Sequence, residues 1–209
     1  SGADITAVYK EEEVPKGMIN KPTSSTAMYY TFGIENDRVK KMYINLNENK
    51  KQNLSMNIYI LERERLINWV NTAFVRGYAY FERDILAPNL DKINVHPYKF
   101  EGYSARIWDM KSYFDENMKL LEDENLDSLF AGNQIYTKIR DDNPTRYMDG
   151  AKVKNIMAAD GCVIEGDVEN SVLFRGVKVG KGAKVRNCVL LQDTVVEAGA
   201  DGEYVISDK

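Results

Sequence analysis

The amino-acid sequence predicts a mixed α/β domain followed by a left-handed parallel β-helix of hexapeptide repeats. The β-helix is predicted by self-similarity: Asn155 to Val168 overlays Asn170 to Ala183 at an offset of 15, and a third copy runs from Asn187 to Ala200 at an offset of 17. The preceding residues instead alternate β-rich runs with amphipathic helical stretches. We therefore expect two parts of different architecture in one chain.

The α/β part is expected to occupy residues 1–131. Its β-rich runs are Asp4–Tyr9, Ala27–Ile34, Arg38–Ile44, Leu54–Leu61 and Ile93–Tyr98. Helices are expected at Glu62–Asn71 and Asp109–Glu122, the second with an apolar stripe at three- and four-residue steps. Residues 132–150 are polar and contain a proline, which predicts a connector between the two parts.

The repeats of residues 151–209 predict three short strands per coil of about 18 residues. An aliphatic residue is followed four positions later by a small or β-branched one, which we interpret as an interior position followed by a corner. The pairs are Ile164 with Val168, Val179 with Ala183 and Val196 with Ala200. Asparagine returns at one template position, at 155, 170 and 187, which is typical of turns with left-handed backbone angles.

Composition excludes several classes of protein. The chain has 209 residues, a net charge of −4 and 44% hydrophobic residues, enough to build real cores. It has no apolar run of about 18 residues, and its cations are not gathered in a stripe. We therefore expect a cytoplasmic protein that binds neither membrane nor nucleic acid.

The cysteine and histidine residues do not indicate a metal site or a catalytic site. Cys162 and Cys188 are not in a CxxC motif and fall at apolar repeat positions, which predicts reduced, buried thiols. An acyltransferase of the hexapeptide class would need a histidine base near the coils. The single histidine, His96, lies far upstream, which argues against that activity.

Two stretches carry a resemblance to a known family: Ile135 to Arg140 with Pro144 to Tyr147, and Asn170 to Ala183. With an α/β part before a β-helix, they resemble glucose-1-phosphate adenylyltransferase, or ADP-glucose pyrophosphorylase, of bacterial glycogen synthesis. The resemblance implies a fragment: the back half of a Rossmann-like nucleotide-diphospho-sugar transferase domain plus the first coils of its β-helix. The family's glycine-rich nucleotide loop would lie outside this sequence.

The family's sugar-phosphate pocket is degenerate here. In a Phe-x-Glu-Lys-Pro motif of the family, the lysine pairs with the phosphate of glucose 1-phosphate; this sequence has Asn45 where that lysine belongs. The sugar-contacting strand, usually Ala-Ser-Met-Gly-Ile-Tyr, keeps Ser55 but has Asn57 for glycine. The resemblance therefore implies a pocket that has lost its cation and is crowded near the sugar.

The family's metal position is also altered. An acidic residue of a Gly-Thr-x-(Asp/Glu) motif helps to hold the Mg²⁺ of catalytic members, and Lys111 takes its place here. A positive charge about 4 Å from a divalent cation costs on the order of 8 kcal/mol at an effective dielectric constant of about 20. Asp109 is two residues away and points about 200° around the helix axis. We expect this chain to bind no metal or other cofactor.

The family's effector-anion site uses basic residues of the connector. Lys138, Arg140 and Arg146 match those positions and could hold a sugar-phosphate or nucleotide effector. A solvated polar linker is the alternative interpretation of the same residues.

Together these substitutions resemble the GlgD-type subunits of the family, which implies a regulatory or non-catalytic subunit that pairs with a catalytic sister chain. Two alternatives stay open. The chain could belong to an active sugar-phosphate nucleotidyltransferase, or to a pure scaffold whose pocket binds nothing.

Overall fold

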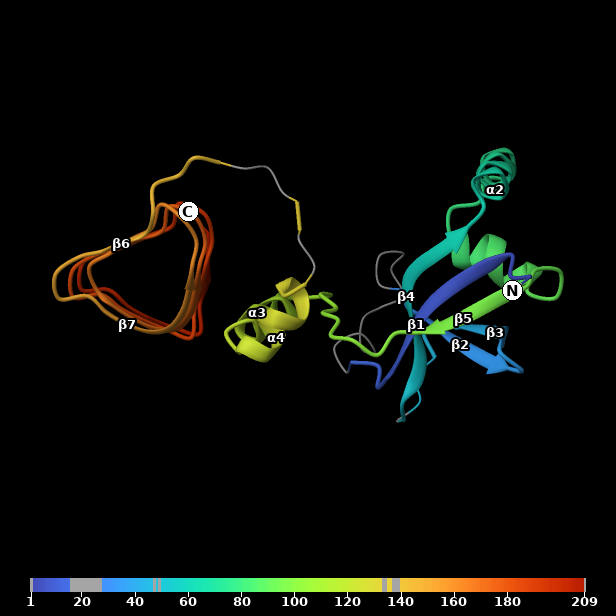
Figure 1. The fold of residues 1–209 in the computed structure, drawn as a ribbon, viewed down its shortest axis with the longest axis horizontal. Helices are drawn as coiled ribbons and strands as arrows, with labels where there is room; N and C mark the ends of the chain where they lie inside the picture. The colour runs from blue at the N-terminus through green and yellow to red at the C-terminus, as the bar shows by residue number, and fades with distance from the viewer. Residues whose placement is uncertain are drawn as a thin grey trace. The chain divides into compact units, whose positions relative to one another are not determined.

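The computed structural model describes residues 2–15, 28–46, 48, 50–132, 135–136 and 140–208. The chain divides into two compact units, Ser1–Gly102 and Tyr103–Lys209, and each is described by itself (Figure 1). The α/β part predicted from the sequence extends to residue 131. In the structure, residues 103–131 belong to the same compact unit as the coils.

The first unit is built on a five-stranded sheet in the order β3-β2-β4-β1-β5. The strands are β1 (Ile5–Glu12), β2 (Tyr30–Glu35), β3 (Arg38–Ile44), β4 (Gln52–Leu61) and β5 (Val95–Lys99). Strands β1 and β5 are parallel, and the other pairs are antiparallel. Strand β3 coincides with its predicted run, and the ends of the other strands lie within three residues of the predicted ends.

Helices follow β4 and lead back to β5. Helix α2 (Arg63–Arg76) ends at Gly77, whose left-handed φ of 68° lets its N–H cap the last turn. A π-helical turn η1 (Phe81–Leu86) and a 3₁₀ turn η2 (Ala87–Asn89) come next and were not predicted. Leu86 and Leu90 pack with Ile5, Phe32 and Val95, so this segment covers the apolar core of the sheet.

The second unit opens with two helices, α3 (Met110–Lys119) and α4 (Asp123–Phe130). Helix α3 was predicted and lies against β9 (Asp167–Leu173) and β12 (Val189–Leu190) of the coils. Helix α4 was not predicted. None of the helices in the described part of the chain has the length and apolar character to span a bilayer.

The coils form the predicted parallel β-helix, seen in Figure 1 as nested triangular turns. The remaining strands are β6 (Arg146–Tyr147), β7 (Lys152–Ala158), β8 (Val163–Ile164), β10 (Lys178–Val179), β11 (Lys184–Arg186), β13 (Val195–Val196), β14 (Asp201–Glu203) and β15 (Ile206–Ser207). Strands β6, β8, β10 and β13 stack into one face, and all their pairings are parallel. Because β6 belongs to this stack, the coils begin upstream of position 151.

The repeat length differs from the predicted value of about 18. Val179 pairs with Val196 and Ile164 with Val179, so successive coils are offset by 17 and by 15 residues. The shorter coil turns from β8 to β9 through Glu165 and Gly166 alone. A Cβ on Gly166 would lie 2.5 Å from the carbonyl oxygen of Ala183, so only glycine fits this tight corner.

This short corner overturns one sequence interpretation. Val168 was equated with Ala183 as a corner residue, but it pairs with Val185 and is 1% exposed. Val168 is therefore an interior residue. The constant offset fails because two residues are missing between β8 and β9.

A ladder of asparagine side chains marks the corner between two faces. Asn155, Asn170 and Asn187 have φ of 48°, 48° and 50°. The Asn155 amide donates to Asn170 Oδ1 at 2.7 Å, and the Asn170 amide donates to Asn187 Oδ1 at 2.6 Å. In the fourth coil Tyr204 takes the same corner with φ of 55°, and its ring lies 6.4 Å from that of Phe114. The predicted left-handed turns are confirmed.

Two substitutions of Asn170 separate its hydrogen bonds from its backbone conformation. Asn170→Gly removes two side-chain hydrogen bonds, each worth about 1 kcal/mol, but tolerates the positive φ. Asn170→Ala removes the same bonds and adds about 1–2 kcal/mol of left-handed strain. We expect stability in the order wild type, Asn170→Gly, Asn170→Ala, measured by urea unfolding followed by circular dichroism. Equal stability of the two variants would contradict the expected cost of left-handed backbone strain in Asn170→Ala.

Both cysteines are free and buried in the interior of the coils, as predicted. The Cys162 thiol donates to the carbonyl oxygen of Phe174 at 3.1 Å, and the Cys188 thiol donates to that of Arg186 at 3.1 Å. Burial raises the pKa of both thiols above the usual value. They are therefore held as thiols in the core.

Burial and a raised pKa predict that neither thiol reacts while the coils are folded. With Ellman's reagent at pH 8, we expect no rapid labelling of the native chain and two equivalents in denaturant. Rapid labelling of either cysteine in the native protein would show that its part of the core opens readily.

Candidate functional site

Asn45, which the sequence resemblance equates with the lysine of the family pocket, has a structural role in this chain. It follows β3 with φ of 53°. Its N–H donates to the carbonyl oxygen of Tyr29 at 3.0 Å, and its Oδ1 accepts from the N–H of Tyr29 at 3.0 Å. The side-chain amide thus closes the end of the β2–β3 pair and brings no positive charge to this position.

Ser55 and Asn57 lie at an irregularity of β4. Val8 pairs with Ile58 and Tyr9 with Ser55, so Met56 and Asn57 are extra residues in the pairing. Asn57 is exposed and has φ of 56°, a conformation that glycine adopts freely and asparagine tolerates. At this position, which the sequence resemblance equates with a glycine of the family, asparagine keeps the left-handed backbone.

The Ser55 hydroxyl is buried and engaged. It accepts from the N–H of Asn57 at 3.1 Å and lies 3.1 Å from the hydroxyl of Tyr59. Burial is the main cause that raises the pKa of Tyr59, so this phenol stays protonated. Ser55 therefore fixes the local shape of β4.

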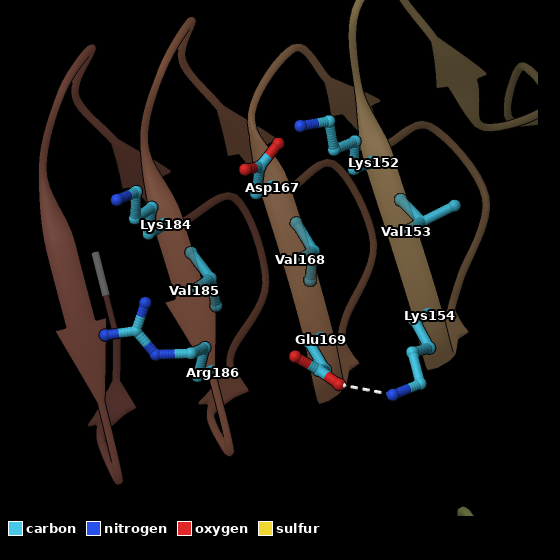
Figure 2. A pocket seen from close by; sticks show the side chains of 9 residues that line it. All are labelled: Lys152, Val153, Lys154, Asp167, Val168, Glu169, Lys184, Val185 and Arg186. Atoms are coloured by element: carbon cyan, nitrogen blue, oxygen red, sulfur yellow. Dashed lines mark hydrogen bonds and ion pairs between the residues drawn. The ribbon is translucent and has the colours of Figure 1, made fainter.

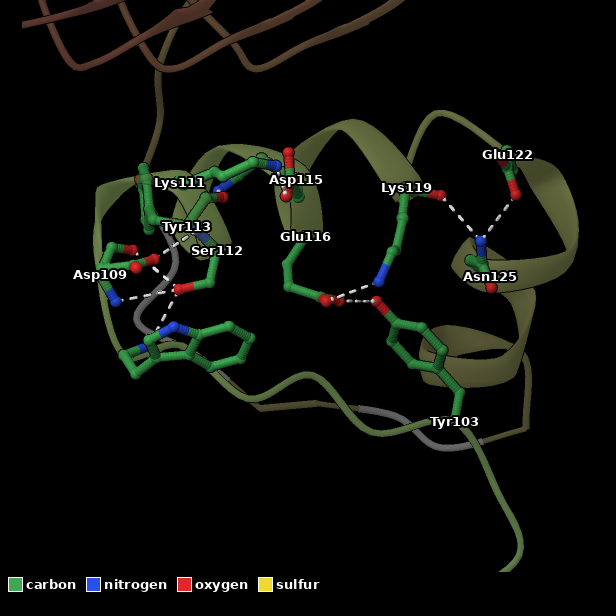
Figure 3. Close-up of polar contacts among 12 residues, drawn as sticks. Tyr103, Asp109, Lys111, Ser112, Tyr113, Asp115, Glu116, Lys119, Glu122 and Asn125 are labelled. Carbon is green, nitrogen blue, oxygen red and sulfur yellow. Dashed lines mark hydrogen bonds and ion pairs between the residues drawn. The ribbon is translucent and has the colours of Figure 1, made fainter. Parts of the chain in front are cut away.

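Lys111 lies on the first turn of α3, in the second unit (Figure 3). Its ammonium forms an ion pair with the Asp115 carboxylate, one helical turn further on, and its side chain is 81% exposed. The Lys111 ammonium is thus held by an (i, i+4) partner on the same helix.

Asp109 is the N-cap of α3. Its Oδ1 accepts from the N–H of Ser112 at 2.8 Å, and the Ser112 hydroxyl accepts from the N–H of Asp109 at 2.9 Å. This reciprocal pair satisfies two backbone donors that the helix start would leave open. The same helix is tied to the start of the unit by Tyr103, which donates to Glu116. Burial raises the pKa of Tyr103 to about 12.

These residues do not fit the family's metal position. Lys111 is a cation with an acidic partner of its own, and the Asp109 carboxylate is engaged in capping. No group of three or more His, Cys, Asp or Glu side chains is arranged to hold a metal ion within the described residues.

The predicted effector residues are only partly described. Lys138 lies outside the described residues. Arg146 is exposed in β6, where it pairs with Val163, so it belongs to the first coil rather than to the connector. Arg140 lies 3.7 Å from the Asp142 carboxylate, which Arg175 of the coils also approaches at 3.7 Å. Sequence reasoning missed Asp142 and Arg175, because only the winding of the coils brings position 175 back to the connector.

Comparison with known proteins supports the sequence resemblance. A family model described as GlmU-like, C-terminal hexapeptide matches residues 138–209. The glycogen biosynthesis protein GlgD of Bacillus subtilis is 34% identical over 156 residues, covering 74% of this chain and 45% of that protein. GlgD of Geobacillus stearothermophilus is 37% identical over 162 residues, covering 75% and 47%. A glucose-1-phosphate adenylyltransferase of Bacillus cereus is 32% identical over 216 residues, covering 96% and 57%.

The chain is a relative of GlgD and of the glucose-1-phosphate adenylyltransferases. It spans about half the length of the curated relatives that it matches. The resemblance inferred from the sequence is thereby confirmed, while the roles of Asn45, Ser55, Asn57, Lys111, Arg140 and Arg146 stay predictions.

The capping arrangement of α3 can be tested by substitution. Asp109→Ala removes the acceptor for the Ser112 N–H and should destabilise the helix start by about 0.5–2 kcal/mol. Asp109→Asn keeps an acceptor and serves as the matched control. We expect amide hydrogen exchange of Lys111, Ser112 and Tyr113 to accelerate in Asp109→Ala only. Equal acceleration in both variants would mean that the charge, and not the cap, holds the helix start.

Proposed function

We propose that this chain is part of a regulatory or non-catalytic subunit of ADP-glucose pyrophosphorylase, the enzyme that makes ADP-glucose and diphosphate from ATP and glucose 1-phosphate in glycogen biosynthesis. The subunit would join a catalytic sister chain in the cytoplasm. The names of the relatives, GlgD and glucose-1-phosphate adenylyltransferase, support this assignment.

The observation that carries the proposal is the start of α3. A nucleotidyltransferase needs negative charge there to help hold Mg²⁺ against the phosphates. This chain instead has the exposed Lys111–Asp115 pair and a capping Asp109. Restoring a metal ligand would require breaking either the ion pair or the cap.

The state of the sugar pocket agrees with this proposal. A phosphate bound near Asn45 would meet a neutral amide that is already bonded to the Tyr29 backbone. Ser55 and Asn57 are likewise engaged with β4 itself. The polypeptide conformation of the pocket is kept by local hydrogen bonds, while the groups that would bind a charged ligand are replaced.

Control by an effector would act through the connector. The carboxylate of Asp142 lies between the guanidinium groups of Arg140 and Arg175. A phosphorylated effector would compete with this carboxylate for the two arginines, since both carboxylate and phosphate suit the planar guanidinium. Arg146 and Lys138 would add charge to the same part of the chain.

Activity assays of a full-length protein that contains this sequence test the proposal. We expect little ADP-glucose from ATP, Mg²⁺ and glucose 1-phosphate with this protein alone, and a several-fold rise in the activity of a co-expressed catalytic sister. The control is the same co-expression with an inactivated sister chain, which should abolish turnover. Robust Mg²⁺-dependent turnover by the protein alone would favour the active nucleotidyltransferase instead.

Calorimetric titration with glucose 1-phosphate and fructose 1,6-bisphosphate distinguishes the remaining alternative. Saturable heat that is lost in Arg140→Gln supports an effector-binding subunit, with Arg63→Gln on α2 as the matched control. No saturable heat with either ligand would favour a pure scaffold.

A further inference from the structure

One face of the coils carries charges that alternate in sign from coil to coil. It consists of β11, β14 and the first halves of β7 and β9, and we call its outward residues the charged face. These residues are Lys152, Lys154, Asp167, Glu169, Lys184, Arg186, Asp201 and Glu203. Figure 2 shows the first three rows, with small valines between the charged side chains. The rows, numbered as coils one to four in chain order, thus carry two cations, two anions, two cations and two anions.

The strand register places unlike charges next to each other in two columns. Lys152 pairs with Asp167, which pairs with Lys184, which pairs with Asp201. The second column runs Lys154, Glu169, Arg186 and Glu203 in the same register. Neighbouring strands are about 4.8 Å apart, so like charges in one column would repel along its whole length.

Ion pairs form within the second column and, through Asp201, between the two columns. Lys154 lies 2.8 Å from Glu169, and Arg186 lies 2.9 Å from Asp201 and 3.8 Å from Glu203. Lys154, and then Arg186, lower the pKa of Glu169. By contrast, Lys152, Asp167 and Lys184 form no ion pair with another described residue, and both lysines are exposed. The face therefore retains charge that faces solvent.

The order of the rows is self-complementary under one kind of two-fold symmetry. Two copies can meet face to face about an axis parallel to the strands, between β9 and β11. Coil one then lies opposite coil four of the partner, and coil two opposite coil three, so cations meet anions in every row. A two-fold axis parallel to the axis of the β-helix would instead place each row opposite the same row of the partner, with cations facing cations.

We propose that the charged face binds a second copy of this chain, with the two β-helices antiparallel about a two-fold axis parallel to the strands. Lys152 then faces the partner's Asp201, and Asp167 faces the partner's Lys184. The association is isologous, since each contact occurs twice. It does not depend on the function proposed above.

The size of the charge array sets the expected strength. Four rows span about 14 Å, and the two columns are about 7 Å apart. A standard interface covers about 800 Å² per partner, so this smaller face should give a weak dimer governed by electrostatics. The Debye length falls from about 10 Å at 0.1 M salt to about 3 Å at 1 M. The dimer should therefore form at low salt and dissociate at high salt.

Sedimentation velocity of the chain at 30 mM and 500 mM NaCl tests the proposal. We expect concentration-dependent dimerisation at 30 mM only. Lys152→Glu with Lys154→Glu reverses coil one, and Asp201→Lys with Glu203→Lys reverses coil four. Each double variant alone places like charges opposite each other and should weaken dimerisation about tenfold or more.

Mixing the two double variants is the decisive experiment. In the mixed pair, the reversed coil one of one copy faces the reversed coil four of the other, so the signs are complementary again. We expect dimers to return in the mixture. A variant that had merely lost stability would not be rescued by mixing, and circular dichroism of each variant checks its fold.

The matched control is Lys178→Glu with Lys181→Glu, which makes the same change in charge at exposed positions off the charged face. It should dimerise as the unmodified chain does. The proposal is overturned if the unmodified chain is monomeric at 30 mM salt, if its dimer is insensitive to the coil-one reversal, or if the mixture stays monomeric.

Discussion

Each paired strand residue of the β-helix lies directly above its equivalent in the next coil, one strand spacing away, and this constraint governs the side chains of the coils. A column of identical side chains is stable only when the side chain is compatible with its own copy. Valines satisfy this inside, where Val168 and Val185 are both buried. Asparagines satisfy it at the corner, because an amide is donor and acceptor at once. Charges satisfy it only by alternating in sign.

The first unit shows a different use of asparagine. Asn45 and Asn57 both have left-handed backbone angles, and the sequence resemblance equates both with pocket positions of the family. Their side chains or backbone groups bond within the sheet, to Tyr29 and Ser55. The backbone conformation at these two positions is therefore held by hydrogen bonds within the sheet.

Periodic local patterns could be predicted from the sequence, whereas contacts between residues that are distant in the sequence could not. The strands of the sheet and the recurring Asn155, Asn170 and Asn187 follow from local patterns. The capping role of Asp109 could have been found, because serine follows three residues later. Helix α4 was missed because its eight residues are too short for a clear stripe.

The register of the coils was harder to predict than their existence. A constant offset equated Val168 with Ala183, since nothing in the local sequence reveals a missing pair of residues. The strand at Arg146 escaped notice for the related reason that only two of its residues pair. The approach of Arg175 to Asp142 depends on the accumulated length of a whole coil. Such contacts arise only once the coils have wound.

The two-residue turn at Glu165 and Gly166 shows where such a protein can change length. Strand pairing is intact on both sides of it, at Ile164 with Val179 and at Asp167 with Lys184. A deletion at a corner is therefore absorbed by one turn, and the columns on all three faces keep their partners. Corners of this kind can diverge in evolution or accept grafted loops, whereas a deletion within a strand would shift every later residue out of its column.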